Sequence, residues 1–287
     1  MSIIIDIAEG KKILPHIVVV GTGANGSLIL QSIAQMVSIF KLNGEIVAAD
    51  PDVVESKNLG NQHFVLQDIG KYKADVLRDR YTAAYKKPHK VNISSFTSSY
   101  IEDIETLGSL YKNKYKILEK EADDNYLYLP ILIGAVDNMF SREVFHQYFN
   151  QCENLIYIDV GNTAVTVPTN WREIDKKHWT PQQLKDYKNS GYNGQVVCGI
   201  KRNGEVILPP LGDLFPDAFK EKETAPSQLS CSELAASEPQ RVITNKFAAL
   251  SVSQFVNELF DEGTVSNHYI IFHAQKAFMK AAPIGEQ

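Results

Sequence analysis

Residues 17–30 read IVVVGTGANGSLIL. The stretch begins as a run of branched aliphatic residues, typical of a buried β-strand, and continues after Gly26 as an apolar segment with helical spacing. Between them lies the pattern G-x-G-x-x-G. In a loop that joins a strand to a helix, such glycines let the backbone approach a phosphate, and the helix N-terminus supplies free N–H groups. The stretch therefore predicts a nucleotide site with these candidate residues: Gly21, Gly23, Ala24, Asn25 and Gly26.

The first half of the chain alternates apolar runs with amphipathic segments. Strands are predicted at residues 16–21, 45–50, 90–96, 129–137 and 154–161, and helices at 25–42, 70–86 and 141–152. The segment 105–128 is rich in Lys, Glu and Tyr, which predicts a solvated helix or an insertion. Strands that alternate with helices indicate an α/β fold with a Rossmann-like, mostly parallel (mixed) sheet and helices on both faces.

The second half is less regular. Prolines and glycines in 168–194 predict an excursion from the sheet, and 208–230 predict a long loop. A hairpin is expected around Asn203-Gly204, because Asn-Gly is a favoured hairpin turn. A helix is expected from about residue 241 to 260. Its apolar stripe is predicted to comprise Ile243, Phe247, Leu250, Phe255 and Leu259.

Composition bounds the class of protein. The 287 residues are 44% hydrophobic, enough for a large core, and we expect a single domain over 1–287 with a nucleotide-binding half (about 1–165) and an irregular half (about 166–287). The net charge is −5 and the basic residues are scattered, so neither nucleic acid nor a membrane is expected as a partner. No apolar run reaches the length of about 18 residues that a membrane-spanning helix needs. The N-terminus has no signal-peptide pattern, so a cytoplasmic location is expected.

The two acidic residues after the second predicted strand do not decide which nucleotide binds. A NAD site places an acid at the end of that strand to bind the ribose hydroxyls, and both Asp50 and Asp52 stand at a suitable distance from the glycines. Up to this point a NAD-dependent oxidoreductase remains an alternative, although no catalytic His or Tyr/Lys pair stands in a recognisable context.

A longer pattern favours ATP. Fixed spacing joins Asp50-Pro51-Asp52, Val54, Asn58-Leu59, Gln62, Gly70 and Lys73, and a later segment adds Asp137, Asn138 and Arg142. On these residues the chain resembles the superfamily of ThiF, MoeB and the ubiquitin-activating enzymes. The segments NGQVVCG and PSQLSCSELAASEPQ make it most similar to the ThiF-family component of bacterial PRTRC cassettes. The resemblance covers residues 16–260, apart from the insertions at 105–128 and 168–190.

The resemblance implies a ThiF-like adenylation fold and a reaction. In this superfamily ATP reacts with the C-terminal carboxylate of a small ubiquitin-like or sulfur-carrier-like protein, giving an acyl-adenylate and pyrophosphate. The implied roles are ribose binding for Asp52, phosphate contacts for Asn58 and Lys73, and Mg²⁺ binding for Asp137. Lys73 is the implied source of transition-state charge stabilisation, with Lys71 as a nearby competitor. Asp50, Gln62 and Asn138 complete the implied nucleotide site.

The implied cofactors are ATP and Mg²⁺. The implied partners are a small ubiquitin-like protein, an acceptor resembling a conjugating enzyme, and a second copy of the chain in a homodimer.

The chain departs from the superfamily pattern at two arginines. Asn61 stands where the motif N-L-x-R-Q has arginine, and the first arginine of the chain is Arg78, so none lies in the N-terminal segment. Lys11 and Lys12 are substitutes there, although lysine lacks the forked donors of arginine. An arginine acting on a phosphoryl transition state accelerates the reaction by orders of magnitude. Slow activity, a cation from a partner, or a non-catalytic nucleotide-binding dimer are therefore the alternatives.

Three cysteines remain to be assigned. They are far apart and include no C-x-x-C pair, which predicts neither a disulfide framework nor a structural zinc site. Cys231, in the segment Ser230-Cys231-Ser232-Glu233, resembles the active cysteine of some ubiquitin-like activating enzymes, and a structural cysteine at a helix cap is the alternative. Cys198, in an apolar strand, and Cys152, near a helix end, are predicted to be structural.

Overall fold

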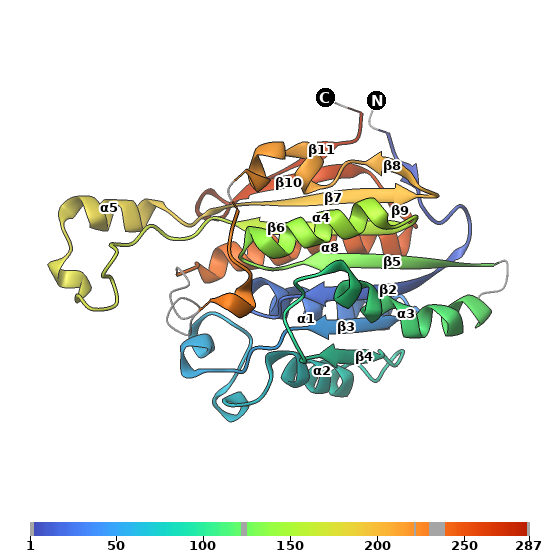
Figure 1. The fold of residues 1–287 in the computed structure, drawn as a ribbon, viewed down its shortest axis with the longest axis horizontal. Coiled ribbons are helices and arrows are strands. Elements are labelled where there is room, and N and C mark those ends of the chain that lie inside the picture. Colours follow the sequence, from blue (N-terminus) through green and yellow to red (C-terminus); the bar gives the residue numbers. More distant parts are fainter. Residues whose placement is uncertain (1–2, 122–124, 221, 230–238, 286–287) are drawn as a thin grey trace.

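One large sheet organises the chain (Figure 1). The computed structural model describes residues 3–121, 125–220, 222–229 and 239–285. The nine strands of the sheet are β2 (Lys12–Val20), β3 (Glu45–Ala49), β4 (Ile93–Phe96), β5 (Tyr126–Gly134), β6 (Leu155–Asn162), β7 (Asn193–Arg202), β8 (Glu205–Leu208), β10 (Asn267–His273) and β11 (Phe278–Pro283). Two short strands, β1 (Ile5–Asp6) and β9 (Thr264–Val265), form a separate pair.

The strand order is β11-β10-β7-β6-β5-β2-β3-β4, with β8 paired to β7. The strands from β6 to β4 run parallel, and β7, β8, β10 and β11 pair antiparallel at the other end of the sheet. The predicted α/β fold with a mixed, mostly parallel sheet is therefore confirmed, and so is the predicted hairpin of β7 and β8. The hairpin of β10 and β11 was not predicted.

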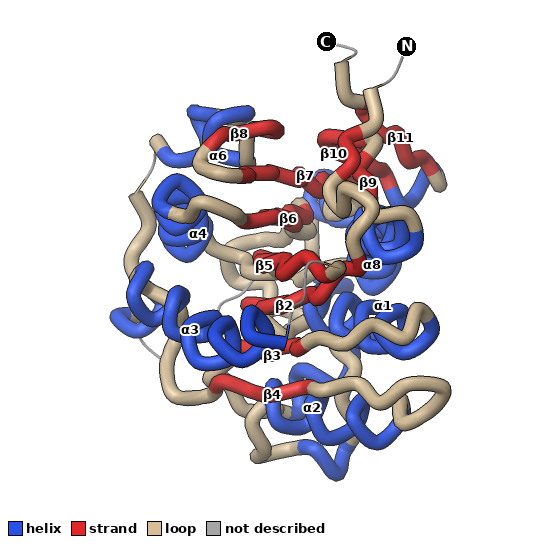
Figure 2. The backbone as a smooth tube through the Cα atoms, turned by 90° about the vertical axis from the view of Figure 1, so that its right-hand side faces the viewer, coloured by secondary structure: helices blue, strands red, loops and turns tan. Residues whose placement is uncertain are grey.

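Helices cover both faces of the sheet. Figure 2 shows α3 and α4 on one side of the strands and α1 and α8 on the other. The helices are α1 (Ala24–Ile39), α2 (Lys73–Ala84), α3 (Ile104–Glu121), α4 (Met139–Gln151), α5 (Pro181–Asn189), α6 (Leu211–Leu214) and α8 (Val242–Asp261). None of the described helices combines the length and the apolar character that crossing a membrane requires.

The position of β2 inside the sheet explains why the aliphatic run at 17–20 correctly predicted a buried strand. Ile17 and Val19 belong to the apolar cluster that includes α1 and α8, whereas Val18 and Val20 belong to the cluster that includes α3 and α4. Successive side chains of a strand point to opposite faces. A strand covered on both faces therefore needs an unbroken apolar run, as residues 17–20 provide.

The predicted apolar stripe on α8 is wrong in part. Phe255 and Leu259 are buried, but Ile243 is 44% exposed and Leu250 is 58% exposed. Small residues such as Ala248 line the buried side of α8, which packs on α1. In the first half of α8 the buried side chains are small or polar, so the large apolar residues mark the buried side only in the second half.

The two irregular segments differ from each other. Residues 163–192 leave the sheet between β6 and β7 and project from the body as an arm that carries α5, which confirms the predicted excursion (Figure 1). The described part of 208–230 is less loop-like than predicted, because it contains α6 and the short 3₁₀ turns Pro216–Phe219 and Pro226–Gln228.

We predict that Gly26→Ala destabilises the fold. A Cβ at residue 26 would lie 1.8 Å from the carbonyl oxygen of Gly21, inside the tight turn between β2 and α1. Elsewhere in a helix the same change stabilises by about 0.5–1 kcal/mol. Here we expect a loss of about 2 kcal/mol or more in the free energy of unfolding, measured in urea. Gly60→Ala is the matched control, since nothing lies within 4 Å of its Cβ position. Equal stability of the two variants would contradict the prediction.

Candidate functional site

The predicted nucleotide residues gather where three parallel strands end. The Gly21 N–H donates to the carbonyl of Ala49, which ends β3, and the Ala135 N–H donates to the carbonyl of Val20, which ends β2. In open α/β sheets, ligands bind beyond the carboxyl ends of the strands. The loops after β2, β3 and β5 therefore share one edge, and they carry the glycines, Asp50 with Asp52, and Asp137.

The glycine loop opens directly into α1. Gly21 has a φ of +84°, a conformation that side chains disfavour. Gly23 is the N-cap of α1 and provides no side-chain hydrogen bond to the first turn. The first amide groups of a helix lack intrahelical partners, so this end attracts an anion.

Asp50 holds the glycine loop to the end of β3. The backbone N–H and the hydroxyl of Thr22 both donate to Asp50 Oδ2, at 2.7 and 3.0 Å, and the Asp52 N–H donates to Oδ1 at 2.9 Å. The residue is 8% exposed. Burial raises the pKa of Asp50, and the charge of Lys73 opposes that rise. Both oxygens of Asp50 therefore accept hydrogen bonds within the site, whereas the side chain of Asp52 is 41% exposed and is the more accessible carboxylate.

Lys73 and Asp52 form an ion pair beside the carboxyl ends of these strands. Lys73 Nζ lies 2.8 Å from Asp52 Oδ2, and the Lys73 N–H donates to the carbonyl of Asp52 at 2.8 Å. Burial lowers the pKa of Lys73, but Asp50, Asp52 and, more weakly, Asp137 outweigh it, so the pKa is raised. The ammonium group is therefore charged and is surrounded by carboxylates at the start of α2.

The structure separates Lys73 from its competitor Lys71. Lys73 is 7% exposed, whereas Lys71 is exposed to solvent. The buried ammonium group is the one directed at the carboxylates, because only Lys73 is held by Asp52.

Tyr100 is a site residue that the sequence did not reveal. Its hydroxyl donates to Asp52 Oδ1 at 2.5 Å, and burial together with the Asp52 carboxylate raises the pKa of Tyr100. Each carboxylate oxygen carries two lone pairs, so Asp52 retains acceptor capacity for a ligand hydroxyl group. Tyr100 follows β4, so its position after a parallel strand was the available signal.

The segment after Asp52 carries Asn58, Asn61 and Gln62. Asn58 is buried, and its Oδ1 accepts from the Glu55 N–H at 2.7 Å, which leaves its amide N–H groups for a ligand. Gln62 Nε2 lies 3.7 Å from the Cβ position of Gly23, so it faces the glycine loop. Among the described residues, the buried oxygens Asn61 Oδ1 and Gln62 Oε1 accept no hydrogen bond. They suit donors from a bound ligand.

The loop after β5 carries Asp137, Asn138 and Arg142. Asp137 is exposed and close enough to raise the pKa of Lys73. The Asn138 side chain caps α4 by accepting from the Ser141 N–H at 2.8 Å. Arg142 Nη2 donates to the carbonyl of Val136, at 3.0 Å, and to that of Val160, at 2.7 Å, so it holds the ends of β5 and β6 together. Arg142 therefore positions the loop that presents Asp137.

The part of the chain that the structure describes contains no group of three or more His, Cys, Asp or Glu residues that could hold a metal ion. Mg²⁺ in nucleotide sites is bound through one or two carboxylates, substrate phosphates and water. A single exposed carboxylate beside the glycine loop, as at Asp137, fits that donor set.

A buried amide network joins the glycine loop to both halves of the chain. Asn162 Nδ2 donates to Asn25 Oδ1 and to Asn245 Oδ1, each at 2.9 Å. Asn162 ends β6, Asn25 lies in the first turn of α1, and Asn245 lies in the first turns of α8. Because these residues are far apart in the sequence, no local pattern revealed the network.

The segment that precedes Cys231 passes over this edge of the sheet. Glu223 Oε2 accepts from the Met139 N–H at 2.6 Å, and the Ser227 N–H donates to Glu102 Oε1 at 2.6 Å. Cys231 itself lies outside the described residues. Cys198 is buried in β7, as predicted, and burial raises its pKa to about 12. Cys152 caps the end of α4.

Lys11 and Lys12 lie far from the glycine loop of their own chain. Lys12 begins β2 and Gly21 follows its last residue, a separation of roughly 30 Å along the strand. Neither lysine therefore reaches the glycine loop within one chain.

Comparisons with known proteins agree with this geometry. The ThiF family model matches residues 11–284. The chain belongs to the ThiF family. A comparison with curated proteins finds no match.

Solved structures share the fold at low sequence identity. The crystal structure of PaaA is 14% identical, with a TM-score of 0.57 over 94% of this chain and 64% of that chain. Escherichia coli MccB solved with ATP is 15% identical, with a TM-score of 0.51 over 95% of this chain and 64% of that one. MccB solved with AMPCPP and MccA is 15% identical, with a TM-score of 0.52 over 98% and 66%. This ThiF-family chain thus spans about two thirds of the length of these structures.

We predict that Asp52→Asn weakens the fold at neutral pH and less so in acid. Burial raises the pKa of Asp52, but Lys73 and Tyr100 together lower it by more than burial raises it. The folded-state pKa of Asp52 therefore lies below its usual value. A lowered carboxyl pKa stabilises the fold above the unfolded-state pKa of about 3.9, and this is lost as pH falls through the folded-state pKa. The stability difference between wild type and variant, from urea unfolding, should therefore shrink below about pH 4. A difference independent of pH would contradict this.

Proposed function

We propose that this chain binds ATP with Mg²⁺ and adenylates the C-terminal carboxylate of a small ubiquitin-like protein. One observation carries the proposal: the buried ammonium group of Lys73 lies among Asp50, Asp52 and Asp137 beside a glycine loop that opens a helix. Membership in the ThiF family and the fold shared with MccB solved with ATP support ATP as the nucleotide. MccB solved with MccA supports a polypeptide as the second substrate.

The reaction forms one bond and breaks one. A carboxylate oxygen of the substrate protein attacks the α-phosphorus of ATP, the bond to the bridging oxygen breaks, and pyrophosphate leaves with the electron pair. Charge on the α-phosphate oxygens and the leaving group must be offset. Lys73 supplies a fixed positive charge in a partly buried site, where such stabilisation is strong. Binding of ATP would draw Lys73 from Asp52 toward the phosphates and leave Asp52 to accept from the ribose hydroxyls.

The remaining residues bind and orient. Asn58 and Gln62 offer amide groups next to the glycine loop, and Asp137 is the carboxylate that would hold Mg²⁺. Bound there, Mg²⁺ would neutralise phosphate charge as a Lewis acid. We extend the proposal to a homodimer, with one adenylation domain in each chain, as the superfamily resemblance implies.

We predict that Lys73→Met abolishes ATP–pyrophosphate exchange while Lys71→Met does not. The measurement uses purified protein, ATP, Mg²⁺ and candidate ubiquitin-like proteins with a free C-terminus. Loss of the charge at Lys73 should lower the exchange rate by about 100-fold or more. Lys71 is the matched control, since it is exposed and two residues away. A wild-type protein without exchange across such partners, or equal loss in both variants, would contradict the proposal.

A second step involves Cys231. By its resemblance to the active cysteine of some activating enzymes, we propose that its thiolate attacks the acyl-adenylate, which forms a thioester and releases AMP. A conjugating-enzyme-like protein would then accept the acyl group. We predict that Cys231→Ala retains ATP–pyrophosphate exchange but loses the adduct that a thiol reductant cleaves, as read on non-reducing gels. Retention of the adduct in Cys231→Ala would rule out this cysteine.

One feature favours a second candidate, a nucleotide-binding dimer without turnover. Asn61 replaces the arginine of the superfamily motif, and its Oδ1 accepts no hydrogen bond from the described residues. ATP binding by calorimetry without any exchange would support this candidate. If the chain instead bound NADH more tightly than ATP, this result would support the alternative of a NAD-dependent oxidoreductase.

A further inference from the structure

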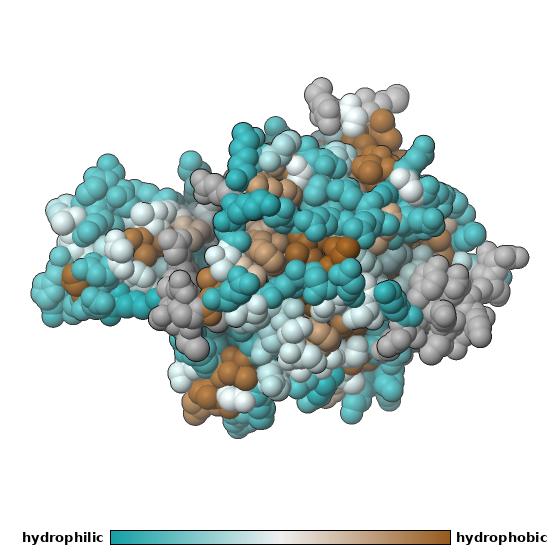
Figure 3. Space-filling model, in the orientation of Figure 1, coloured by the Kyte–Doolittle hydropathy of each residue, from teal (hydrophilic) through white to brown (hydrophobic). Residues whose placement is uncertain are grey.

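The arm at residues 163–192 is longer than the sheet requires. β6 and β7 are antiparallel neighbours, with Asn162 opposite Gly194, and antiparallel neighbours are often joined by two residues. The arm instead projects from the body as a mostly hydrophilic lobe (Figure 3). It is nevertheless ordered, since Thr180 caps α5 and the buried Trp179 packs edge-on against Tyr187, with ring centroids 5.5 Å apart.

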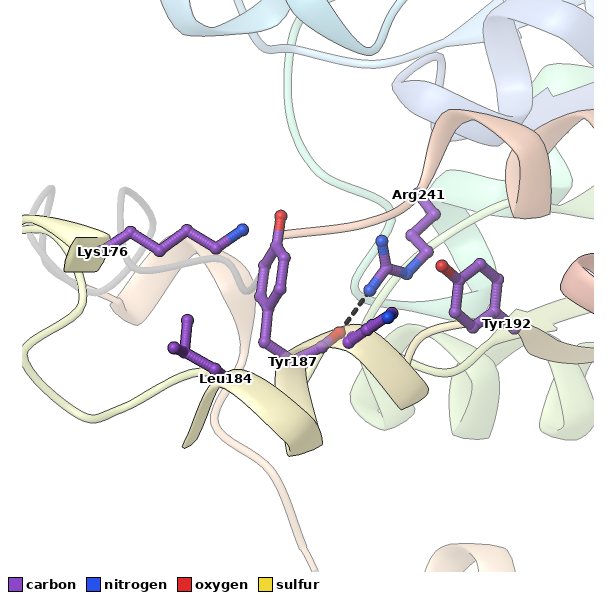
Figure 4. A pocket seen from close by; sticks show the side chains of 6 residues that line it. Lys176, Leu184, Tyr187, Tyr192 and Arg241 are labelled. Atoms are coloured by element: carbon purple, nitrogen blue, oxygen red, sulfur yellow. Dashed lines mark hydrogen bonds between the residues drawn. The ribbon is translucent and has the colours of Figure 1, made fainter. Parts of the chain in front are cut away.

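A cleft of about 270 Å³ opens where the arm meets the body. The residues that line it are Lys176, Leu184, Tyr187, Lys188, Tyr192 and Arg241. Arg241 comes from the start of α8, and the other residues come from the arm and its return to β7 (Figure 4). No acidic side chain is among these residues, although the chain as a whole has a net charge of −5. The cleft is therefore a local concentration of positive charge.

Aromatic rings hold the cationic groups in place. Lys176 Nζ lies 3.5 Å from the centroid of the Tyr187 ring. The Arg241 guanidinium carbon lies 4.2 Å from the Tyr192 ring centroid and 5.1 Å from that of Tyr187. Arg241 also donates to the carbonyl of Ser190 at 2.8 Å and to the carbonyl of Tyr187. The charges of Lys176 and Arg241 are thus preorganised, which lowers the entropic cost of binding an anionic group.

The cleft is joined directly to the nucleotide site. Arg241 precedes Asn245 by four residues, a rise of about 6 Å along a helix. Asn245 shares the amide of Asn162 with Asn25 of the glycine loop. The Thr244 hydroxyl donates to the carbonyl of Gly191 at 2.7 Å, which fixes the arm to α8. A polypeptide whose C-terminus reaches the glycine loop therefore has this cleft within a few residues of its path.

We propose that the cleft binds an acidic segment of the protein whose carboxylate is adenylated. Carboxylates of this segment would pair with Lys176, Lys188 and Arg241, and the tyrosine rings would cover its backbone. Complementary charge contributes mainly to partner choice and association rate, so the arm selects the substrate rather than performing chemistry. The inference rests on the proposed function. A polypeptide is favoured over nucleic acid because the cationic side chains line one small cleft and form no stripe along which a continuous phosphate backbone could lie.

The test measures binding of a fluorescein-labelled, glutamate-rich peptide with a free C-terminus to the full chain, by fluorescence anisotropy without ATP. A peptide with glutamine in place of glutamate is the ligand control. We expect Lys188→Glu to weaken binding about tenfold and Lys176→Glu with Lys188→Glu to weaken it further. Lys185→Glu is the matched control, because it makes the same charge change on α5 outside the cleft. It should alter binding by no more than about twofold.

Three results would overturn the inference. They are equal binding of the glutamine peptide, equal weakening by Lys185→Glu, and displacement of the acidic peptide by a single-stranded oligonucleotide that binds more tightly. Circular dichroism of each variant confirms that the fold is intact. Since peptide binding is measured without ATP, it stands or fails separately from the proposed reaction. A wild-type chain that binds the peptide but shows no pyrophosphate exchange would contradict the reaction and not the cleft.

Discussion

The site depends on one buried carboxylate that must be compensated. Asp50 directly follows β3 and is buried, so its charge is balanced by three donors from Thr22 and Asp52 and by the ammonium group of Lys73. The donors from Thr22 tie the glycine loop to β3, and the charge of Lys73 ties the start of α2 to the same place. Breaking a buried charge pair by removing one partner is costly. The loop, the strand end and the start of α2 are therefore held together as one unit.

Much of the fold follows from local patterns in the sequence. The unbroken aliphatic run at 17–20 predicts a strand covered on both faces, and the alternation with helical segments predicts the parallel part of the sheet. The common edge at which parallel strands end accounts for the meeting of Asp50 and Asp137, but Lys73, which begins α2, and the role of Asp137 were indicated only by the superfamily resemblance. Tyr100, Asn162 and Asn245 reach the site only through tertiary contacts. The stripe on α8 was mispredicted in its first half, where the buried side chains are small or polar. The hairpin of β10 and β11 carries no turn signal that we recognised.

The structure shows the surroundings of Asn61, which stands where the superfamily motif has arginine. Asn61 leaves a buried oxygen without a donor among the described residues, in a segment whose neighbour Gln62 faces the glycine loop. Lysines at the start of β2 do not reach this position in their own chain. A cation for the departing pyrophosphate would then come from the nucleotide-bound metal or from a second copy. The arm adds a separate cationic surface beside the site, which suits recognition of a protein substrate before chemistry begins.

A crystal structure of the chain with Mg²⁺ and a non-hydrolysable ATP analogue tests the central claim most directly. The account predicts phosphates against the glycine loop, Lys73 Nζ within hydrogen-bond distance of a phosphate oxygen, the ribose on Asp52, and the metal on Asp137. A nucleotide bound elsewhere, or one whose phosphates do not contact Lys73 while it stays paired with Asp52, would contradict it.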